Sequence, residues 1–345
     1  MDRDYREIAQ TVRLLYVSDT LPGIRRIKKG KGFSYVAGRK AVTGEDLTRI
    51  KKLVIPPAWT RVWICSSANG HIQATGYDLR GRKQYRYHAL WSAARKETKF
   101  HRLYEFGKSL PALRLRLEED LGRKALCQEK VVAAVIALME RTYIRVGNED
   151  YEKLYGSHGI TTLKDNHVTI KGDTMRFSFK GKKGVFQNVS LSNRRLARVV
   201  KQCRDIPGKE LFQYYDADGA RRSIDSGVVN EYIKAATRTE YTAKDFRTWA
   251  GSLNLLRALK AAGEAVTQAE RKKNIVTALD EVSQKLGNTR TVCKNYYVHP
   301  KLIELYEEDA LSKYLKELDA IELPDGQTEL TRDEKLLMRI LKSLH

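Results

Sequence analysis

The hydrophobic pattern of this chain changes its period about a quarter of the way along, and this change limits the possible folds more than any other feature. Before about Trp91, short apolar runs such as residues 33–36 are separated by Gly, Pro and charged residues, which is typical of short strands. Beyond it, apolar residues recur at helical spacing. The sequence therefore predicts an α+β protein, with a small β-rich N-terminal domain over residues 1–95 and a larger, mainly α domain over residues 96–345.

The larger domain is expected to hold a small β-sheet among its helices. Residues 161–189 interrupt the helical pattern with strand-like stretches at 168–170 and 175–179, which are joined by Gly-containing turns. A helix is predicted over about 127–143, before these strands. Further helices are predicted near Ser192, near Asp225, from a capped start at Thr242, and over 268–286, 301–320 and 331–344.

The charge of the chain predicts a polyanionic partner. A net charge of +22 and a pI of about 9.7 exceed what solubility needs, so DNA or RNA is the leading class of partner, ahead of an anionic membrane surface. Residues 1–98 carry 20 basic against 8 acidic residues, which makes this part the more basic one. Because there is no 18-residue apolar run and the first ten residues lack the apolar core of a signal peptide, we expect a cytoplasmic, nucleoid-associated protein.

The sequence predicts no cofactor and no metal site. Its four cysteines lie far apart without a C-x-x-C pair, and its seven histidines are scattered. Neither an H-E-x-x-H motif nor a phosphate-binding G-x-x-x-x-G-K-[ST] loop is present in the sequence. We therefore expect disulfides and structural zinc to be absent and any chemistry to depend on side chains alone.

Five residues of the larger domain have side chains suited to attack on a phosphodiester. Taken singly, they have ordinary interpretations, such as a salt-bridged arginine, a solvated basic turn, a structural helix arginine or a packed tyrosine. Together they supply cations, a proton donor, an amide and a nucleophile. The five are Arg145, Lys182, Arg247, Asn288 and Tyr297.

Each of the five has a definable task in that chemistry. Arg145, Arg247 and Asn288 could hold the non-bridging oxygens, whose charge increases during attack, and each donor would contribute about 3 kcal/mol. Lys182, with a pKa lowered by neighbouring arginines, could protonate the departing 5′-oxygen. Tyr297 could form a phosphodiester of its own, because a phenol with an ordinary pKa of about 10 is a better leaving group than an alkoxide, so the strand can be resealed.

The order and spacing of these segments resemble the catalytic domain of the short bacterial and viral type IB DNA topoisomerases, over most of the chain. That family has an arginine after a helix, a lysine on a β-hairpin, a K-x-x-R helix motif, and a His or Asn nine residues before the nucleophilic tyrosine. The viral members carry His where this chain has Asn, which leaves only hydrogen bonding at that position. The matching residues are Arg145, Lys182 after Gly181, Lys244-Asp245-Phe246-Arg247, Asn288 and Tyr297, whereas Tyr296 lacks the nine-residue spacing.

A segment of the N-terminal domain is similar to the part of that family that contacts DNA. Residues 81–87 read Gly-Arg-Lys-Gln-Tyr-Arg-Tyr. Gln84 and Tyr85 are the expected groove readers, since Gln can make two hydrogen bonds to adenine while Arg and Lys neutralise phosphates. Without the resemblance, the segment would be interpreted as a charged strand. The predicted DNA-binding residues are Arg82, Lys83, Gln84, Tyr85, Tyr87 and Lys244.

The resemblance implies a two-domain clamp on double-stranded DNA that cleaves one strand through a 3′-phosphotyrosyl link, allows strand rotation and religates. It implies no need for ATP or an obligatory metal. A monomer is expected, because one copy can surround DNA and no heptad repeat is evident. Two alternatives stay open. A tyrosine recombinase has related chemistry, although recombinases usually read H-x-x-R and carry a helical N-terminal domain, and a basic architectural protein would leave Tyr297 merely packed.

Overall fold

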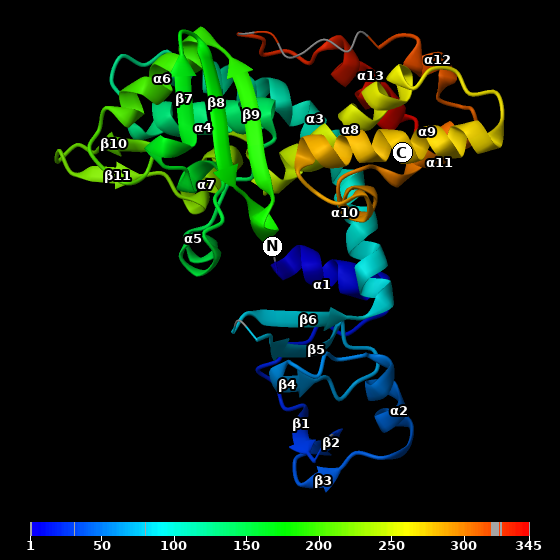
Figure 1. Ribbon diagram of the computed structural model, residues 1–345. Helices are drawn as coiled ribbons and strands as arrows, with labels where there is room; N and C mark the ends of the chain where they lie inside the picture. Colours follow the sequence, from blue (N-terminus) through cyan, green and yellow to red (C-terminus); the bar gives the residue numbers. More distant parts are fainter. Residues whose placement is uncertain (1, 31, 80, 319–323, 325, 345) are drawn as a thin grey trace. The chain divides into compact units, whose positions relative to one another are not determined.

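The protein folds into two compact units, Met1–Phe100 and His101–His345. Figure 1 shows the computed structural model, in which a β-rich region and a mainly helical region follow one another along the chain. The residues that the structure describes are 2–30, 32–79, 81–318, 324 and 326–344. Among these residues, no helix is both long enough and apolar enough to cross a membrane.

The first unit is built on one six-stranded antiparallel sheet with the strand order β3-β2-β1-β4-β5-β6. A small core of Ile24, Ile50, Val62, Ile64 and Ala74 covers the middle of the sheet. Its elements are α1 (Asp2–Thr11), β1 (Ile24–Lys29), β2 (Gly32–Ala37), β3 (Lys40–Ala41), α2 (Gly44–Lys52), β4 (Thr60–Ile64), β5 (Ile72–Tyr77) and β6 (Lys83–Tyr87).

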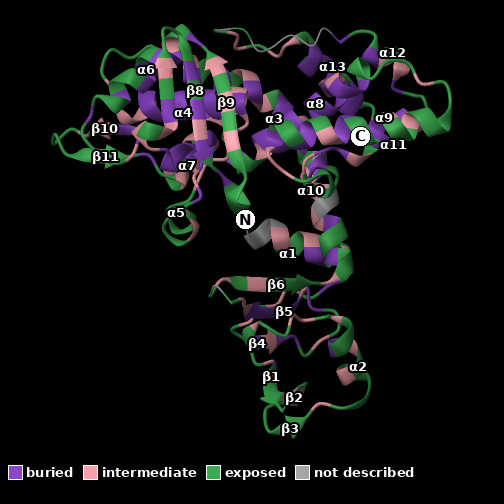
Figure 2. Cartoon of the chain, in the orientation of Figure 1, coloured by how far each residue is buried: buried purple, intermediate pink, exposed green. Residues whose placement is uncertain are grey.

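The second unit is mainly helical. Two of its helices, α4 (Gln128–Thr142) and α8 (Ala243–Ala261), are buried over most of their length. Figure 2 shows α4 as almost wholly buried, which explains its nearly continuous apolar sequence. The other helices are α3 (Ala89–Leu121), which begins before the boundary between the units, α5 (Glu149–Tyr155), α6 (Arg194–Arg204), α7 (Ser226–Thr237), α9 (Gln268–Leu286), α10 (Arg290–Tyr296), α11 (Pro300–Glu307), α12 (Ser312–Leu315) and α13 (Arg332–Lys342).

Two small sheets accompany these helices. A three-stranded antiparallel sheet has the order β7-β8-β9, and a separate hairpin pairs β10 with β11. Together with the six-stranded sheet, they confirm the predicted α+β class with a small sheet inserted in a mainly helical region. The strands are β7 (Val168–Lys171), β8 (Thr174–Lys180), β9 (Phe186–Ser192), β10 (Gln213–Tyr215) and β11 (Arg221–Ser223).

Most of the predicted helices are confirmed, and their caps explain why. The Asp245 carboxylate accepts the backbone N–H of Thr242 at 2.8 Å, which begins α8 as the sequence predicts. Gly287 ends α9 in the left-handed conformation, with φ of 57°. The helices predicted over 127–143 and 268–286 are α4 and α9.

One predicted helix is wrong, and several elements were not predicted. Residues 301–320 do not form one helix, because α11 ends at Glu307 and Asp309 takes a left-handed conformation with φ of 59° before α12. Residues 319 and 320 lie outside the described part. The hairpin of β10 and β11 was missed because its strands are only three residues long, too short for an alternating pattern to be recognised.

Candidate active site

Arg145 lies just beyond the buried helix α4. The helix ends at Tyr143, whose left-handed conformation, with φ of 58°, turns the chain back. The Arg145 guanidinium then donates to the carbonyl oxygen of Gly287 at 2.8 Å and to Oδ1 of Asn288. The end of α4 is thereby tied to the residues that follow α9.

Arg247 enters the same region from α8 and is only 5% exposed. Its two terminal nitrogens donate to the carbonyl oxygens of Tyr143 at 2.5 Å and of Leu286 at 2.6 Å. Within the described residues, its Nε is buried and has no hydrogen-bond partner. A buried donor without an acceptor is costly, so this atom is suited to an acceptor supplied by a ligand.

Asn288 follows the end of α9 and has a side-chain orientation fixed by Arg145. Because the guanidinium can only donate, Oδ1 of Asn288 must face it. This leaves Nδ2 as a buried donor that has the Cys293 thiol, a weak acceptor, beside it and no oxygen or nitrogen acceptor in the described part of the chain. The site therefore holds a second buried donor suited to an anionic ligand.

Neutral oxygens hold both arginines. In the part of the chain that the structure describes, the acceptors of Arg145 and Arg247 are backbone carbonyls and one amide oxygen, and none is a carboxylate. Carbonyls at the end of α9 carry partial negative charge, so they orient the guanidiniums without neutralising them. Burial, and then repulsion by Arg247, lower the pKa of Arg145 to about 10. At neutral pH the positive charge of Arg145 therefore remains available.

Lys182 lies in the turn between β8 and β9, as its place between two strand-like runs predicts. The turn is closed by the N–H of Gly181, which donates to the carbonyl of Val185 at 2.8 Å, and Lys183 takes a left-handed conformation. The Lys182 side chain is at the surface, yet partial desolvation and then repulsion by Arg145 lower its pKa, while Tyr297 opposes this shift. A lysine with a lowered pKa is better suited to donating a proton.

Tyr297 lies at the end of the short helix α10 and is half-buried. The guanidinium carbon of Arg247 lies 5.0 Å from the centre of the Tyr297 ring. Its neighbour Tyr296 is 58% exposed. The structure thus brings the predicted five side chains together, with the ring of Tyr297 beside the guanidinium of Arg247.

Two further residues position this site, and sequence reasoning missed both. A Cβ on Gly251 of α8 would lie 2.3 Å from the carbonyl oxygen of Tyr297, so only glycine leaves room for that backbone. Gln187 of β9 packs where a Cβ of Gly181 or Gly287 would be, which joins the Lys182 turn to the loop of Asn288. A glycine inside a helix was a usable signal, whereas nothing in the sequence marked Gln187.

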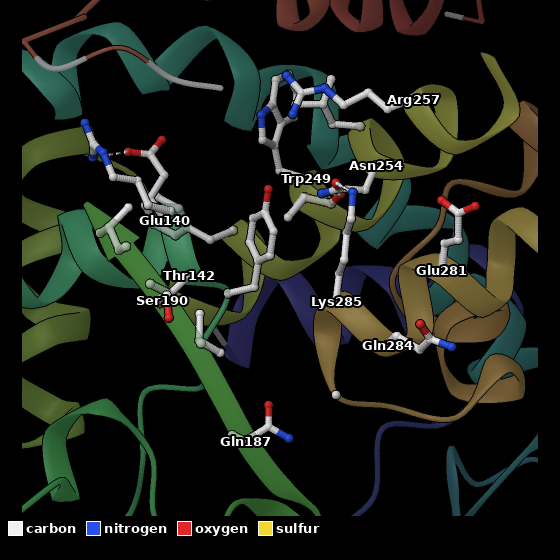
Figure 3. A pocket seen from close by; sticks show the side chains of 18 of the residues that line it. Glu140, Thr142, Gln187, Ser190, Trp249, Asn254, Arg257, Glu281, Gln284 and Lys285 are labelled. Atoms are coloured by element: carbon white, nitrogen blue, oxygen red, sulfur yellow. Dashed lines mark hydrogen bonds and ion pairs between the residues drawn. The ribbon is translucent and has the colours of Figure 1, made fainter. Parts of the chain in front are cut away.

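A cavity of about 1110 Å³ adjoins the loop of Gly287 and Asn288. Figure 3 shows Gln187 and Ser190 of β9 along one side, and Trp249, Asn254 and Arg257 of α8 on the other. Lys285 spans part of the space and donates to Oδ1 of Asn254 at 3.2 Å.

The predicted DNA-binding residues lie in two places. Five of them are on or next to β6 in the first unit, where the rings of Tyr85 and Tyr87 stack with centroids 5.7 Å apart. Lys244 lies in the first turn of α8, one turn before Arg247, and is exposed. The N-terminal segment therefore presents a flat aromatic pair with flanking cations on one strand.

Comparisons with known proteins cover nearly the whole chain. Residues 88–322 match the family described as eukaryotic DNA topoisomerase I, catalytic core, and residues 32–78 match the bacterial DNA topoisomerase IB N-terminal domain. DNA topoisomerase 1B of Acanthamoeba polyphaga mimivirus is 34% identical over 94% of this chain and 95% of its own length. DNA topoisomerase 1B of Vaccinia virus (strain Copenhagen) is 25% identical over 69% of this chain and 74% of its own.

A solved structure gives only a weak likeness. The XerH site-specific recombinase bound to difH substrate is 15% identical, with a TM-score of 0.36 over 60% of this chain and 53% of the recombinase. A score this low does not discriminate between activities.

Proposed function

This chain belongs to the type IB DNA topoisomerases, and from that premise we propose that it relaxes supercoiled duplex DNA by transient cleavage of one strand through Tyr297. The observation that supports this most directly is the pair of buried donors without an oxygen or nitrogen acceptor among the described residues, Nε of Arg247 and Nδ2 of Asn288, close to a tyrosine and two un-neutralised arginines. A phosphodiester would supply the missing acceptors.

The cleavage step follows from these positions. The Tyr297 hydroxyl releases its proton to water, its oxygen attacks phosphorus to form a bond to the 3′-phosphate, and the bond between phosphorus and the 5′-oxygen breaks. Lys182 gives its proton to that oxygen, which leaves as a hydroxyl. Arg145, Arg247 and Asn288 stabilise the added charge on the non-bridging oxygens, each by about 3 kcal/mol. Religation is the reverse reaction, after the free 5′ end has rotated.

Neither ATP nor an obligatory metal takes part in this proposal. The energy of the broken bond is kept in the phosphotyrosyl ester, and the arginines supply the positive charge that a metal would otherwise provide. A monomer is sufficient, because all five groups come from one chain. We propose that the protein acts on genomic DNA in the cytoplasm, at the nucleoid.

The β-rich N-terminal domain, residues 1–95, is proposed to bind duplex DNA through β6, with the catalytic domain, residues 96–345, completing a clamp. Binding of this kind releases counterions, so log K should fall by about 0.9 for each neutralised phosphate when plotted against log salt. A binding constant that does not change between low and moderate salt would contradict the clamp.

Relaxation of a supercoiled plasmid in EDTA, without ATP, tests the proposal. The parent chain should relax the plasmid, and denaturation during the reaction should trap protein covalently at a 3′ end. Tyr297→Phe should do neither, whereas the neighbouring Tyr296→Phe should retain both activities. An active Tyr297→Phe variant would remove Tyr297 as the nucleophile, and an inactive parent chain would favour a recombinase.

A further inference from the structure

Two carboxylates hold the side chains of β6 that we propose contact DNA. Asp78 accepts from Nε of Arg82 at 2.8 Å and from Nε2 of Gln84 at 3.0 Å. Asp19 forms an ion pair of 2.6 Å with Lys83. Both carboxylates are largely buried, with side chains 16% and 18% exposed. Because Lys83 and Gln84 are consecutive in β6, Asp19 and Asp78 hold their side chains on opposite faces of the strand.

The contact with Asp78 fixes which way the Gln84 amide points. A carboxylate can only accept hydrogen bonds, so the atom of Gln84 that faces Asp78 must be the nitrogen. The amide orientation, which is often ambiguous, is here set by chemistry. Among the described residues, the Oε1 atom of Gln84 has no hydrogen-bond partner, and Nε2 keeps a second N–H.

We propose that Asp78 is a positioning residue that makes Gln84 select adenine. In the major groove, adenine presents an amino donor at N6 beside an acceptor at N7, whereas guanine presents two acceptors, cytosine an amino donor, and thymine an acceptor beside a methyl group. An amide that offers one oxygen and one N–H can make both hydrogen bonds only with adenine. This inference rests on the proposed function, in which β6 enters the groove.

Asp19, which lies in the turn before β1 and pairs with a residue of β6, is a matched control for Asp78. It accepts from Oγ1 of Thr75 at 2.8 Å and pairs with the ammonium of Lys83, a group suited to phosphates rather than to base edges. Removing Asp19 therefore changes the charge near the backbone of the DNA, while removing Asp78 changes the orientation of a base-reading group. Both changes remove one buried carboxylate.

The test is selection from a duplex library with randomised positions, using the full chain with Tyr297→Phe to prevent cleavage. We expect adenine to be preferred about tenfold at one position, the range for a bidentate contact. Gln84→Ala and Asp78→Ala should each abolish the preference at that position, and Asp78→Ala, which also releases Arg82, should in addition change the affinity for all sequences by a common factor. Asp19→Ala should change affinity for all sequences by the same factor. Thermal melting verifies that each variant is folded.

Base analogues test the same contact without changing the protein. Replacing the selected adenine by purine, which lacks the amino group, or by 7-deazaadenine, which lacks N7, should each remove most of the preference. A preference for guanine or thymine at the Gln84-dependent position, or an adenine preference that survives Asp78→Ala, would overturn the inference. Tight binding with no base preference would overturn it and leave the proposed function intact, whereas absence of duplex binding would overturn both.

Discussion

The guanidinium of Arg247 lies over the ring of Tyr297, with 5.0 Å between its central carbon and the ring centre, while its terminal nitrogens are held by two backbone carbonyls. The cation and the ring attract one another by about 0.5–1 kcal/mol or more where water is excluded. Arg247 thus restrains the proposed nucleophile, and its Nε remains as a donor for the phosphate.

Arg247→Lys should reduce the rate constant of single-turnover cleavage by about a hundredfold or more, because lysine cannot satisfy two carbonyls and also present a donor at the position of Nε. The control is Arg257→Lys on the same helix, which keeps an ion pair with Asp333 and should cleave at the parental rate. Equal losses in both variants would indicate general damage to α8.

Lys182→Ala should slow cleavage by about 10²- to 10⁴-fold, the contribution of a general acid. The parental rate should fall as pH rises through the lowered pKa of Lys182, because only the protonated amine can donate, and the variant should lack this decline. A substrate with sulfur in place of the 5′-oxygen should restore the variant, since a thiolate leaves without a proton.

The control for Lys182 is its neighbour in the turn. Lys183→Asn removes one charge and tolerates the left-handed conformation of that position, so it should retain most of the cleavage activity. If the sulfur substrate did not restore Lys182→Ala, a role for Lys182 as the proton donor would be contradicted.

Variants of Asn288 should lose activity in a defined order. Asn288→Ala loses the acceptor for Arg145 and the donor Nδ2, which should cost about a hundredfold in the cleavage rate constant. Asn288→Asp keeps the acceptor but places a negative charge where the donor was, so it should be slower still. Single-turnover assays measure both, and an Asp variant faster than the Ala variant would mean that Nδ2 does not face the phosphate.

The stability of the second unit at neutral pH should be sensitive to the loss of one partner from a buried ion network. Arg114 is 4% exposed and donates to both oxygens of Glu334, at 3.0 and 2.7 Å, and to Glu140. Glu334→Gln should lower the free energy of unfolding by about 3 kcal/mol, because it leaves part of a buried charge uncompensated. The exposed pair of Glu317 with Arg339 is the control, and Glu317→Gln should cost less than about 1 kcal/mol.

The effect of Glu334→Gln should depend on pH in a known direction. Burial would raise the pKa of Glu334, but hydrogen bonding and attraction to Arg114 outweigh it and lower the pKa below its ordinary value. The carboxylate therefore stabilises the fold above the pKa of the unfolded chain, about 4.3, and this contribution is lost as pH falls through the lower folded value. Denaturant titrations should show that the free energies of unfolding of the parent chain and of Glu334→Gln become equal in acid.

The sequence predicted the parts of the fold that depend on regular patterns. Helix α9 was placed correctly because Gly287 and an apolar stripe mark it, whereas the helix expected over 301–320 was wrong because a left-handed Asp309 interrupts it. Interactions between segments that are distant in the sequence have no comparable local pattern. The ion pair of Asp19 with Lys83 depends on strand pairing that a single sequence does not specify.

The proposed site residues were found by a different route. Arg145, Lys182 and Arg247 have no distinctive local pattern, and their order and spacing along the chain, compared with a family, identified them as a group. Gly251 and Gln187 act only by shape, as neighbours of Tyr297 and of the Lys182 turn, so no list of reactive side chains would include them.

The carbonyl groups that hold Arg145 and Arg247 belong to the ends of α4 and α9, so the two guanidiniums are oriented only when these helices and α8 are folded together. A copy of the protein that is misfolded, damaged by heat or partly degraded would lose its cutting activity at once, although its basic surface could still adhere to DNA. The proposed strand cleavage would therefore depend on the intact packing of α4, α8 and α9, whereas non-specific attraction to DNA would not.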